Sequence, residues 1–226
     1  MLTMTGLTKT YRTDSVETTA LDAIDLDIAD GEFVAIMGPS GCGKSTLLNV
    51  MGMLDSPTEG SYVFNGQEVA NLVEAQLADT RKANIGFIFQ SFNLVDELTV
   101  RENVELALLY HNIPSAERKS RVDRVLDKVG IAHRAKHRPT QLSGGQQQRV
   151  AVARALVGEP KLILADEPTG NLDTAHGEEV MRMLRQLNQE GSTIVMVTHS
   201  PAHADFASRV VNMLDGRILQ ERRRAA

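Results

Sequence analysis

Short apolar runs along the chain alternate with longer segments in which apolar residues recur every three or four positions. Four of the runs have the length and β-branched content of buried strands: 33–37, 85–89, 162–165 and 193–197. Between the last two runs, Val180, Met183, Leu184 and Leu187 are spaced for one face of a helix, where the methionine fits as core filler rather than as a metal ligand. Strands that alternate with helices in this way predict an α/β fold around a parallel sheet.

Looser alternation near both ends of the chain predicts antiparallel β-structure. Residues 2–9 and 20–28 are predicted to be strands, and Asn65-Gly66 is the strongest two-residue signal for a hairpin. A second hairpin is predicted within 210–220, and the basic run Arg222–Arg224 is expected to be a solvated tail.

Between about residue 98 and residue 142 the chain has helical patterns and no strand pattern. Thr99 and Glu102 match a capping box that opens one helix. Ser115 is placed to cap a second helix, which carries an apolar face and ends at Gly130. The block is therefore predicted to be a helical subdomain inserted between strands.

The composition restricts the class of protein. With 226 residues and 42% hydrophobic content, the chain is long enough to bury a sizeable core. The net charge of −5 argues against a nucleic-acid surface, and the one cysteine fits a reducing compartment. No run approaches the roughly 18 apolar residues of a membrane span, and no signal peptide is apparent. We expect a soluble, cytoplasmic protein, whose role at a membrane would need another chain.

The first buried run is followed by Gly38–Thr46, which matches the phosphate-binding pattern G-x-x-x-x-G-K-[ST]. Its glycines let the backbone approach an anion, and the helix that follows directs its amides and dipole at the phosphates. Lys44 is expected to reach the β- and γ-phosphates and Ser45 to ligate Mg²⁺. A glycine turn with an exposed lysine is the blander interpretation. The residues predicted to hold the nucleotide here are Gly38, Ser40, Gly41, Cys42, Gly43, Lys44, Ser45 and Thr46.

Two adjacent carboxylates, Asp166 and Glu167, follow the strand predicted at 162–165. Ligands bind at the carboxyl ends of strands in open α/β sheets, where the glycine-rich stretch also lies. Asp166 can hold Mg²⁺, and Glu167 can orient or deprotonate a water in line with the γ-phosphate. Gln90 and His199 end strands too, but their spacing alone favours ordinary side chains over roles at the metal or the phosphate.

The pentapeptide Leu142–Gln146 precedes a helix predicted over 147–156. Ser143 is a natural N-cap for this helix, and the two glycines that follow it expose the first amides. A second anion site is therefore predicted at this helix N-terminus.

Taken in order, these motifs resemble those of the ATP-binding subunit of ATP-binding-cassette (ABC) transporters over essentially the whole chain. The family's Walker A, Q-loop, signature, Walker B, D-loop and switch motifs correspond to 38–46, Gln90, 142–146, 162–166 followed by Glu167, 171–173 and His199. The resemblance implies a P-loop NTPase core with a parallel sheet, an N-terminal antiparallel β subdomain and an inserted α-helical subdomain. One ABC ATPase domain over 1–226 is expected, with its core at 1–90 and 155–226 and a helical signature subdomain at 91–154.

The resemblance also implies roles that spacing alone does not support. Tyr11, by position more simply an ordinary aromatic at a strand end, would stack on adenine. Gln90 would touch the Mg²⁺ and water site and His199 the γ-phosphate, so both join Lys44 and Glu167 as expected catalytic residues. ATP and Mg²⁺ are the implied cofactors, and a head-to-tail homodimer with two ATP molecules at its interface is the implied assembly. Ser143 and Gly145 would meet the γ-phosphate of ATP held by a second subunit, and Gly144, Gln146 and Asp173 are also expected to bind the nucleotide.

The segments 89–94, 98–104 and 146–151 resemble the subfamily that serves macrolide efflux, lipoprotein release, antimicrobial-peptide export and bacterial cell division. The implied partner is an integral membrane permease subunit, which would hold the chain at the inner face of the cell membrane. A non-transport regulator of a membrane complex stays open as an alternative. The short helical block, the single cassette and the acidic balance disfavour an ABC ATPase of DNA repair or the ribosome, so no nucleic-acid partner is expected.

Cys42 lies inside the glycine-rich stretch, beside Lys44 and near a helix N-terminus. These neighbours favour a thiolate, which would react with alkylators unless Mg·ATP protected it. A small residue tolerated at a variable position is the competing interpretation.

Overall fold

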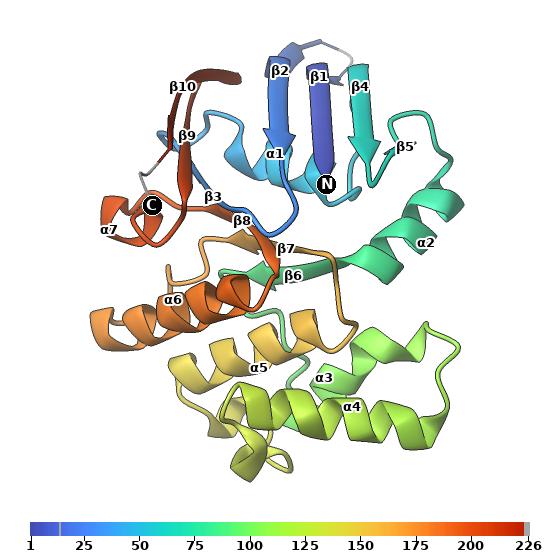
Figure 1. Cartoon of the computed structure of the whole chain (residues 1–226), viewed down its shortest axis with the longest axis vertical. Helices are drawn as coiled ribbons and strands as arrows, with labels where there is room; N and C mark the ends of the chain where they lie inside the picture. Colours follow the sequence, from blue (N-terminus) through green and yellow to red (C-terminus); the bar gives the residue numbers. More distant parts are fainter. Residues whose placement is uncertain (14, 224–226) are drawn as a thin grey trace.

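The structure is a computed structural model that describes residues 1–13 and 15–223, and its strands form two sheets (Figure 1). The larger sheet has six strands in the order β10-β9-β3-β8-β7-β6. These strands are β3 Phe33–Met37, β6 Ile85–Phe89, β7 Leu162–Asp166, β8 Thr193–Val197, β9 Arg209–Leu214 and β10 Arg217–Arg223. All neighbours pair in parallel except β10, which returns antiparallel to β9. The predicted parallel sheet is confirmed.

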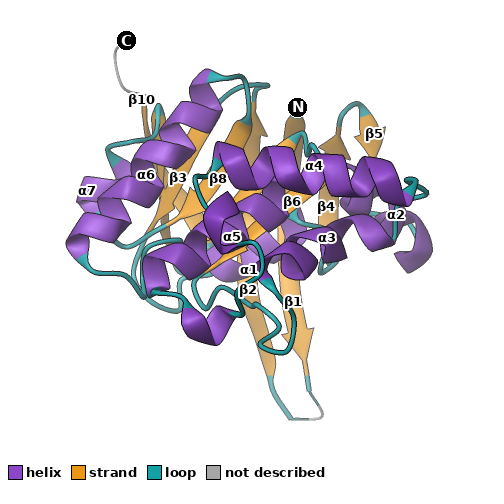
Figure 2. Cartoon of the chain, turned by 90° about the horizontal axis from the view of Figure 1, so that it is seen from below, coloured by secondary structure: helices purple, strands orange, loops and turns teal. Residues whose placement is uncertain are grey.

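Helices fill the sequence between the strands. The α-helices are α1 Lys44–Met51, α2 Glu74–Asn84, α3 Val100–Leu109, α4 Ser115–Lys128, α5 Gly144–Leu156, α6 Thr174–Gln189 and α7 Pro201–Ala204. Over the fully described stretch 90–161 the chain forms helices and no strand, as the patterns predict. Figure 2 shows α3, α4 and α5 together on one side of the sheets. The exact division into a core and a helical subdomain stays a prediction.

The central strands are buried on both faces, and their alternate residues enter two different cores. In β3, Phe33 and Ala35 pack with apolar side chains of α3 to α6, whereas Val34 and Ile36 pack with α1 and the smaller sheet. This period of two follows from the pleat, which points successive side chains to opposite faces. A strand that is apolar throughout therefore lies between two hydrophobic layers.

The smaller sheet has the order β2-β1-β4-β5 and packs over α1 (Figure 1). Its strands are β1 Leu2–Arg12, β2 Glu17–Ile28, β4 Glu59–Phe64 and β5 Gln67–Glu68. The predicted hairpin turn is confirmed, since Asn65 and Gly66 have φ of 49° and 79°. The first two strands extend beyond the predicted ranges, because their backbones stay paired to Arg12 and Glu17, whose side chains form an ion pair.

Three further boundaries also differ from the predictions. Arg222 and Arg223 are not a solvated tail, because their backbones pair with β9 and lengthen the C-terminal hairpin; Arg224 lies outside the described residues. Ser115 is the first residue of α4 rather than its cap, because the Arg118 N–H already bonds to the Pro114 carbonyl. The helix α5 begins at Gly144, directly after its cap.

Among the described residues, no helix combines the length and apolar character needed to cross a bilayer.

Candidate active site

The carboxyl ends of β3, β6, β7 and β8 meet at one edge of the larger sheet and carry most of the predicted site residues. A cavity of about 420 Å³ lies there. It is lined by Ala20, Ser40, Gly41, Gly43, Lys44, Ser45, Thr46, Gln90, Asp166, Glu167, Val197 and His199. Residues from five separate segments of the chain therefore face one space, and the glycine-rich stretch supplies the largest share of them.

The glycine-rich stretch forms a loop that depends on two of its glycines. Gly43 has φ of 101°, and a Cβ there would collide with the carbonyl of Ala20. A Cβ at Gly38 would collide with the carbonyl of Met213 and would lie 2.7 Å from Cys42 Sγ. Lys44 then begins α1, so the free amides of this helix open toward the cavity.

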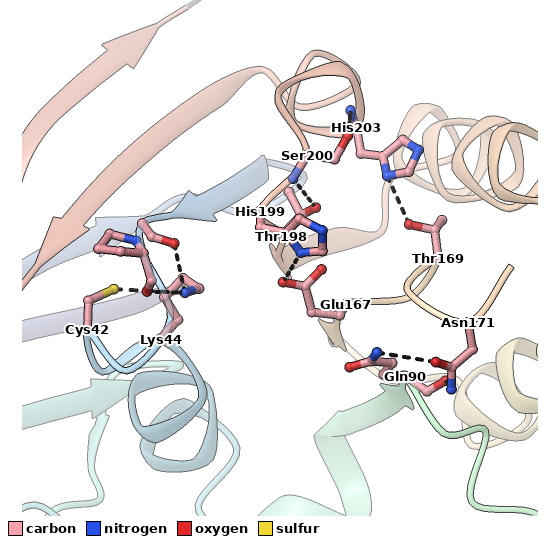
Figure 3. Close-up of polar contacts among 12 residues, drawn as sticks. Cys42, Lys44, Gln90, Glu167, Thr169, Asn171, Thr198, His199, Ser200 and His203 are labelled. Carbon is pink, nitrogen blue, oxygen red and sulfur yellow. Dashed lines mark hydrogen bonds and ion pairs between the residues drawn. The ribbon is translucent and has the colours of Figure 1, made fainter. Parts of the chain in front are cut away.

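Lys44 is held close to the loop that precedes it. Its side chain is only 9% exposed, and Nζ donates to the carbonyls of Gly38 at 2.9 Å and Pro39 at 2.8 Å (Figure 3). These bonds keep a buried cation beside the free amides of α1. The loop therefore offers an anion a concentrated positive field.

Cys42 does not open to the cavity. Its side chain is 3% exposed, and Sγ lies 3.9 Å from Lys44 Nζ. Because a buried thiol is shielded from alkylators, the structure favours the small packed residue over the reactive thiolate.

Asp166 and Glu167 differ in their surroundings. Burial raises the pKa of Asp166, the adjacent charge of Glu167 adds to the shift, and a hydrogen bond with Ser45 and the charge of Lys44 oppose it. Glu167 has φ of 45°, a left-handed conformation that few non-glycine residues adopt. This bend turns its side chain across to His199, whose Nδ1 lies 2.9 Å from Oε1 (Figure 3). The His199 side chain is 75% exposed, so the pair lies at the open side of the site.

Gln90 forms two hydrogen bonds with Asn171, which belongs to the predicted D-loop. Gln90 Nε2 donates to Asn171 Oδ1 at 3.3 Å, and Asn171 Nδ2 donates to the Gln90 carbonyl at 3.0 Å (Figure 3). A Cβ at Gly170 would lie 2.7 Å from Gln90 Nε2, so only glycine allows this approach. The end of β6 is thereby joined to the loop that follows Glu167.

The signature residues are not part of this cavity. Ser143 caps α5, since its Oγ accepts from the Gln146 N–H at 3.3 Å and its own N–H donates to Gln146 Oε1 at 3.2 Å. Asp173 caps α6 and accepts from His176 Nδ1 at 2.6 Å. The His176 ring in turn packs against Gly145, where a Cβ would lie 2.6 Å from Cδ2. Ser143, Gly145 and Gln146 line a separate recess of about 310 Å³.

Tyr11 also lies outside the cavity lining, and it is 43% exposed. Its hydroxyl donates to Asp55 Oδ2 at 2.8 Å, and Lys9 Nζ lies 4.9 Å from the ring centroid and 2.5 Å from Asp55 Oδ1. Burial raises the pKa of Tyr11, and the bond to Asp55 raises it further. Lys9 and Asp55 are not among the site residues predicted from the sequence. The spacing of Lys9 and Tyr11, which puts both on one face of β1, was the available signal.

A second contact near the Glu167–His199 pair was also not predicted from the sequence. Thr169 Oγ1 lies 2.9 Å from His203 Nδ1, and Thr169 is only 7% exposed (Figure 3). Thr169 comes from the loop after β7 and His203 from α7. No local pattern marks either residue, because their contact depends on how the two loops pack.

Known proteins resemble this chain in sequence and in structure. A family model described as "ABC transporter" matches residues 21–170. The macrolide export ATP-binding/permease protein MacB of an Azoarcus species is 48% identical over 221 residues, which are 98% of this chain and 34% of that protein. The uncharacterized ABC transporter ATP-binding protein YknY of Bacillus subtilis is 49% identical over 219 residues, covering 97% of this chain and 95% of that protein.

The fold is shared with a solved ATP-binding cassette, MJ0796, in a dimeric post-hydrolysis state bound to ADP and Pi. The TM-score is 0.90 at 44% identity, and the match covers 99% of this chain and 98% of that one. The chain thus spans about a third of the MacB relative and nearly all of MJ0796 and YknY. The predicted ABC ATPase fold and the predicted ATPase activity are confirmed. With its phosphate loop, its acidic pair and this shared fold, the chain belongs to the ABC transporter family, as an ATP-binding and ATP-hydrolysing cassette.

Proposed function

We propose that this chain is the ATPase subunit of an ABC transporter of the mechanotransmission type, which serves macrolide efflux or lipoprotein release. It dimerises on ATP and drives a separate integral membrane subunit, which holds it at the cytoplasmic face of the cell membrane. The relatives support this proposal. One is named an ATP-binding/permease protein for macrolide export, and the cassette MJ0796 was solved as a dimer.

The observation that carries the proposal is the convergence of Lys44, Glu167 and His199 on one cavity. Lys44 would stabilise the charge of the β- and γ-phosphates. Glu167, whose carboxylate faces the cavity, would orient the attacking water and accept its proton. His199 would exchange its bond to Glu167 for one to the γ-phosphate. Positioning and electrostatic stabilisation are what phosphoryl transfer needs most, and these side chains can supply both.

The oxygen atoms in the cavity fit Mg²⁺. Ser45 and Asp166 share a hydrogen bond beside Lys44, and Gln90 lines the same space. Among the described residues, no cluster of three His, Cys, Asp or Glu side chains could hold a metal by itself. Mg²⁺ in nucleotide sites needs only one or two protein ligands, because phosphates and waters complete its octahedron. Ser45, Asp166 and Gln90 would hold the ion, which would neutralise charge on the phosphates.

The signature residues would complete the site of a second subunit. Ser143 and Gly145 begin α5 in a recess separate from the cavity, so within one chain they do not reach the phosphate loop. A head-to-tail dimer would bring the α5 N-terminus of one subunit to the γ-phosphate on the other. Closure on ATP and opening after hydrolysis would then be the motion passed to the membrane subunit.

A groove of about 590 Å³ is our candidate for the contact with that subunit. Phe89 and Asn93, which flank Gln90 in the sequence, line it together with Leu54, Phe87 and Tyr110. Tyr110 is 79% exposed and Leu54 is 48% exposed, which is unusual for large apolar side chains. One short segment therefore joins the groove to Gln90 in the cavity.

The test is a pull-down of Glu167→Gln from detergent-solubilised native membranes with Mg·ATP. The variant should bind ATP, lose turnover by about 100-fold or more and stay as a dimer, because only the water-orienting group is removed. A polytopic membrane subunit should co-purify, with an extramembrane domain suited to efflux or lipoprotein release. The matched control is Lys44→Ala, which should lose nucleotide affinity and recover no partner.

Three results would contradict the proposal. A Glu167→Gln chain that binds Mg·ATP yet stays monomeric by light scattering would remove the dimer mechanism. Recovery of only ribosomal or nucleic-acid-associated proteins would remove the membrane partner. Recovery of a cell-division complex with no transport domain would favour a regulator instead.

A further inference from the structure

Two cross-links join the loop after β7 to the loop after β8 (Figure 3). The first is the Glu167–His199 contact of 2.9 Å between two expected catalytic residues. The second joins Thr169, two positions after Glu167, to His203, four positions after His199, with 2.9 Å between Oγ1 and Nδ1. The second link has no part in the function proposed above.

The two links differ in their exposure. The His199 side chain is 75% exposed, whereas Thr169 is 7% exposed. The helix α6 backs the buried link at Gly177, where a Cβ would lie 3.6 Å from Thr169 Cβ and 3.9 Å from His203 Cε1. The Glu167–His199 link lies at the open side of the site, where His199 has room to change partners, whereas the Thr169–His203 link is partly buried and is backed by α6.

The His203 end of the buried link is fixed to the sheet by a series of hydrogen bonds. The His203 N–H donates to Ser200 Oγ at 3.3 Å, and the Ser200 N–H donates to Thr198 Oγ1 at 3.1 Å. The Thr198 N–H donates to the Ile36 carbonyl at 3.1 Å, and Thr198 is 1% exposed. These hydrogen bonds therefore connect His203 to β3, the strand that leads into the phosphate loop.

The Thr169 end lies in a tight turn that contains Glu167. The Gly170 N–H donates to the Glu167 carbonyl at 2.9 Å, and the Leu172 N–H donates to the Thr169 carbonyl at 3.1 Å. Glu167 also carries the left-handed φ of 45°, a conformation that persists only when neighbouring contacts hold it. A bond to Thr169 thus restrains the turn that sets the direction of the Glu167 carboxylate.

We propose that His203 is a positioning residue for ATP hydrolysis, which holds the Glu167 turn in place through Thr169 while His199 moves from Glu167 to the γ-phosphate. The inference rests on the roles proposed above for Glu167 and His199. Burial lowers the pKa of His203, so a neutral ring with one nitrogen donor and one acceptor bonds Thr169 near neutral pH.

Three substitutions at His203 test the bond itself. His203→Leu removes both nitrogens and should lower kcat about tenfold, with KM for ATP unchanged within about twofold. His203→Asn should recover most of the lost kcat, because its amide lies as many bonds from Cα as Nδ1 does. His203→Gln is the matched control, since its amide lies one bond further and should recover little.

Thr169 tests the same bond from the other side. Thr169→Val should match His203→Leu, and the double variant should lose no more kcat than either single variant, because both remove one interaction. Thr169→Ser keeps the hydroxyl and should keep most of the activity. Thermal unfolding and ATP affinity, measured on each variant, separate a positioning effect from a folding defect. If His203→Leu does not fold, the Thr169 pair decides the question alone.

Wild-type kcat in His203→Leu and Thr169→Val would overturn the inference, and so would losses that multiply in the double variant. An Asn variant as slow as the Leu variant would overturn it too, because the ring and not its Nδ1 would then matter. If Glu167→Gln keeps full turnover, both the positioning role of His203 and the proposed role of Glu167 are wrong. If Glu167→Gln is inactive and the His203 variants are normal, only the positioning role of His203 falls.

Discussion

At the scale of single residues, the site places a carboxylate where its charge destabilises the fold. Burial and the neighbouring charge of Glu167 raise the pKa of Asp166, so the folded protein favours the protonated form. The same carboxylate is the one that we propose to bind Mg²⁺. We interpret this arrangement as a carboxylate that lowers the stability of the fold but is needed to bind Mg²⁺.

The substitution Asp166→Asn should therefore stabilise the nucleotide-free chain at neutral pH and abolish Mg²⁺-dependent hydrolysis. Because the folded-state pKa of Asp166 lies above its unfolded value, the wild-type side chain weakens the fold as the pH rises through the folded pKa. The gain in Tm, about 2 °C, should be present near pH 7 and become much smaller near pH 4, close to the usual pKa of about 3.9 of an unfolded Asp. Thermal unfolding at both pH values measures it. A variant with a lower Tm than wild type at neutral pH would contradict the argument.

At the scale of elements, the helices α3 and α5 begin with the same kind of capping box but lie in different surroundings. Thr99 caps α3 and Ser143 caps α5, each in a capping box with the residue three positions later. The expected loss on removal of either hydroxyl is about 1 kcal/mol of folding free energy. Only α5, however, begins in the recess of the signature residues.

Ser143→Ala and Thr99→Ala should therefore lose similar stability in chemical unfolding, but only Ser143→Ala should lose ATP-dependent dimerisation. The physical reason is that the Ser143 hydroxyl would bond the γ-phosphate held by the other subunit, whereas Thr99 does not line the recess of the signature residues. Light scattering with Mg·ATP in the Glu167→Gln background measures the dimer. Equal dimerisation of both variants would remove the role of α5 at the γ-phosphate.

At the scale of the whole molecule, the larger sheet joins two surfaces for which we propose different roles. The cavity lies at the carboxyl ends of the strands, and the groove lined by Phe87, Phe89 and Tyr110 lies along β6. Gln90 stands between them and bonds Asn171 in the loop after Glu167. A shift of a partner in the groove would therefore reach the catalytic side chains through one segment.

Tyr110→Asp should weaken recovery of the membrane subunit in the pull-down, because it places a charge on an exposed apolar surface. The side chain is 79% exposed, so the Tm of the isolated chain should change by no more than about 1 °C. Val73→Asp is the matched control, since Val73 is also exposed but does not line the groove. If both variants recovered the membrane subunit equally well, the groove would not be the surface that contacts it.

The sequence by itself determined the strands, most of the helices and the phosphate loop of this protein. Each of these depends on neighbours a few positions apart: the apolar runs of β3 and β8, the glycines of 38–46, and the caps at Thr99 and Ser143. Such patterns can be recognised in a sequence because periodicity, helix capping and phosphate binding depend on residues that are close together in the chain.

Only the tertiary structure decided which distant side chains meet. Glu167 and His199 are 32 positions apart, Thr169 and His203 are 34, Tyr11 and Asp55 are 44, and Gln90 and Asn171 are 81. Three of these contacts follow from the strand order β3-β8-β7-β6, which differs from the order along the chain, whereas Tyr11 in β1 meets the segment after α1. The type of residue at the end of a strand does not show which loop will pack beside it in the folded protein. For that reason Asp55, Thr169 and His203 became visible only when the strands were placed side by side.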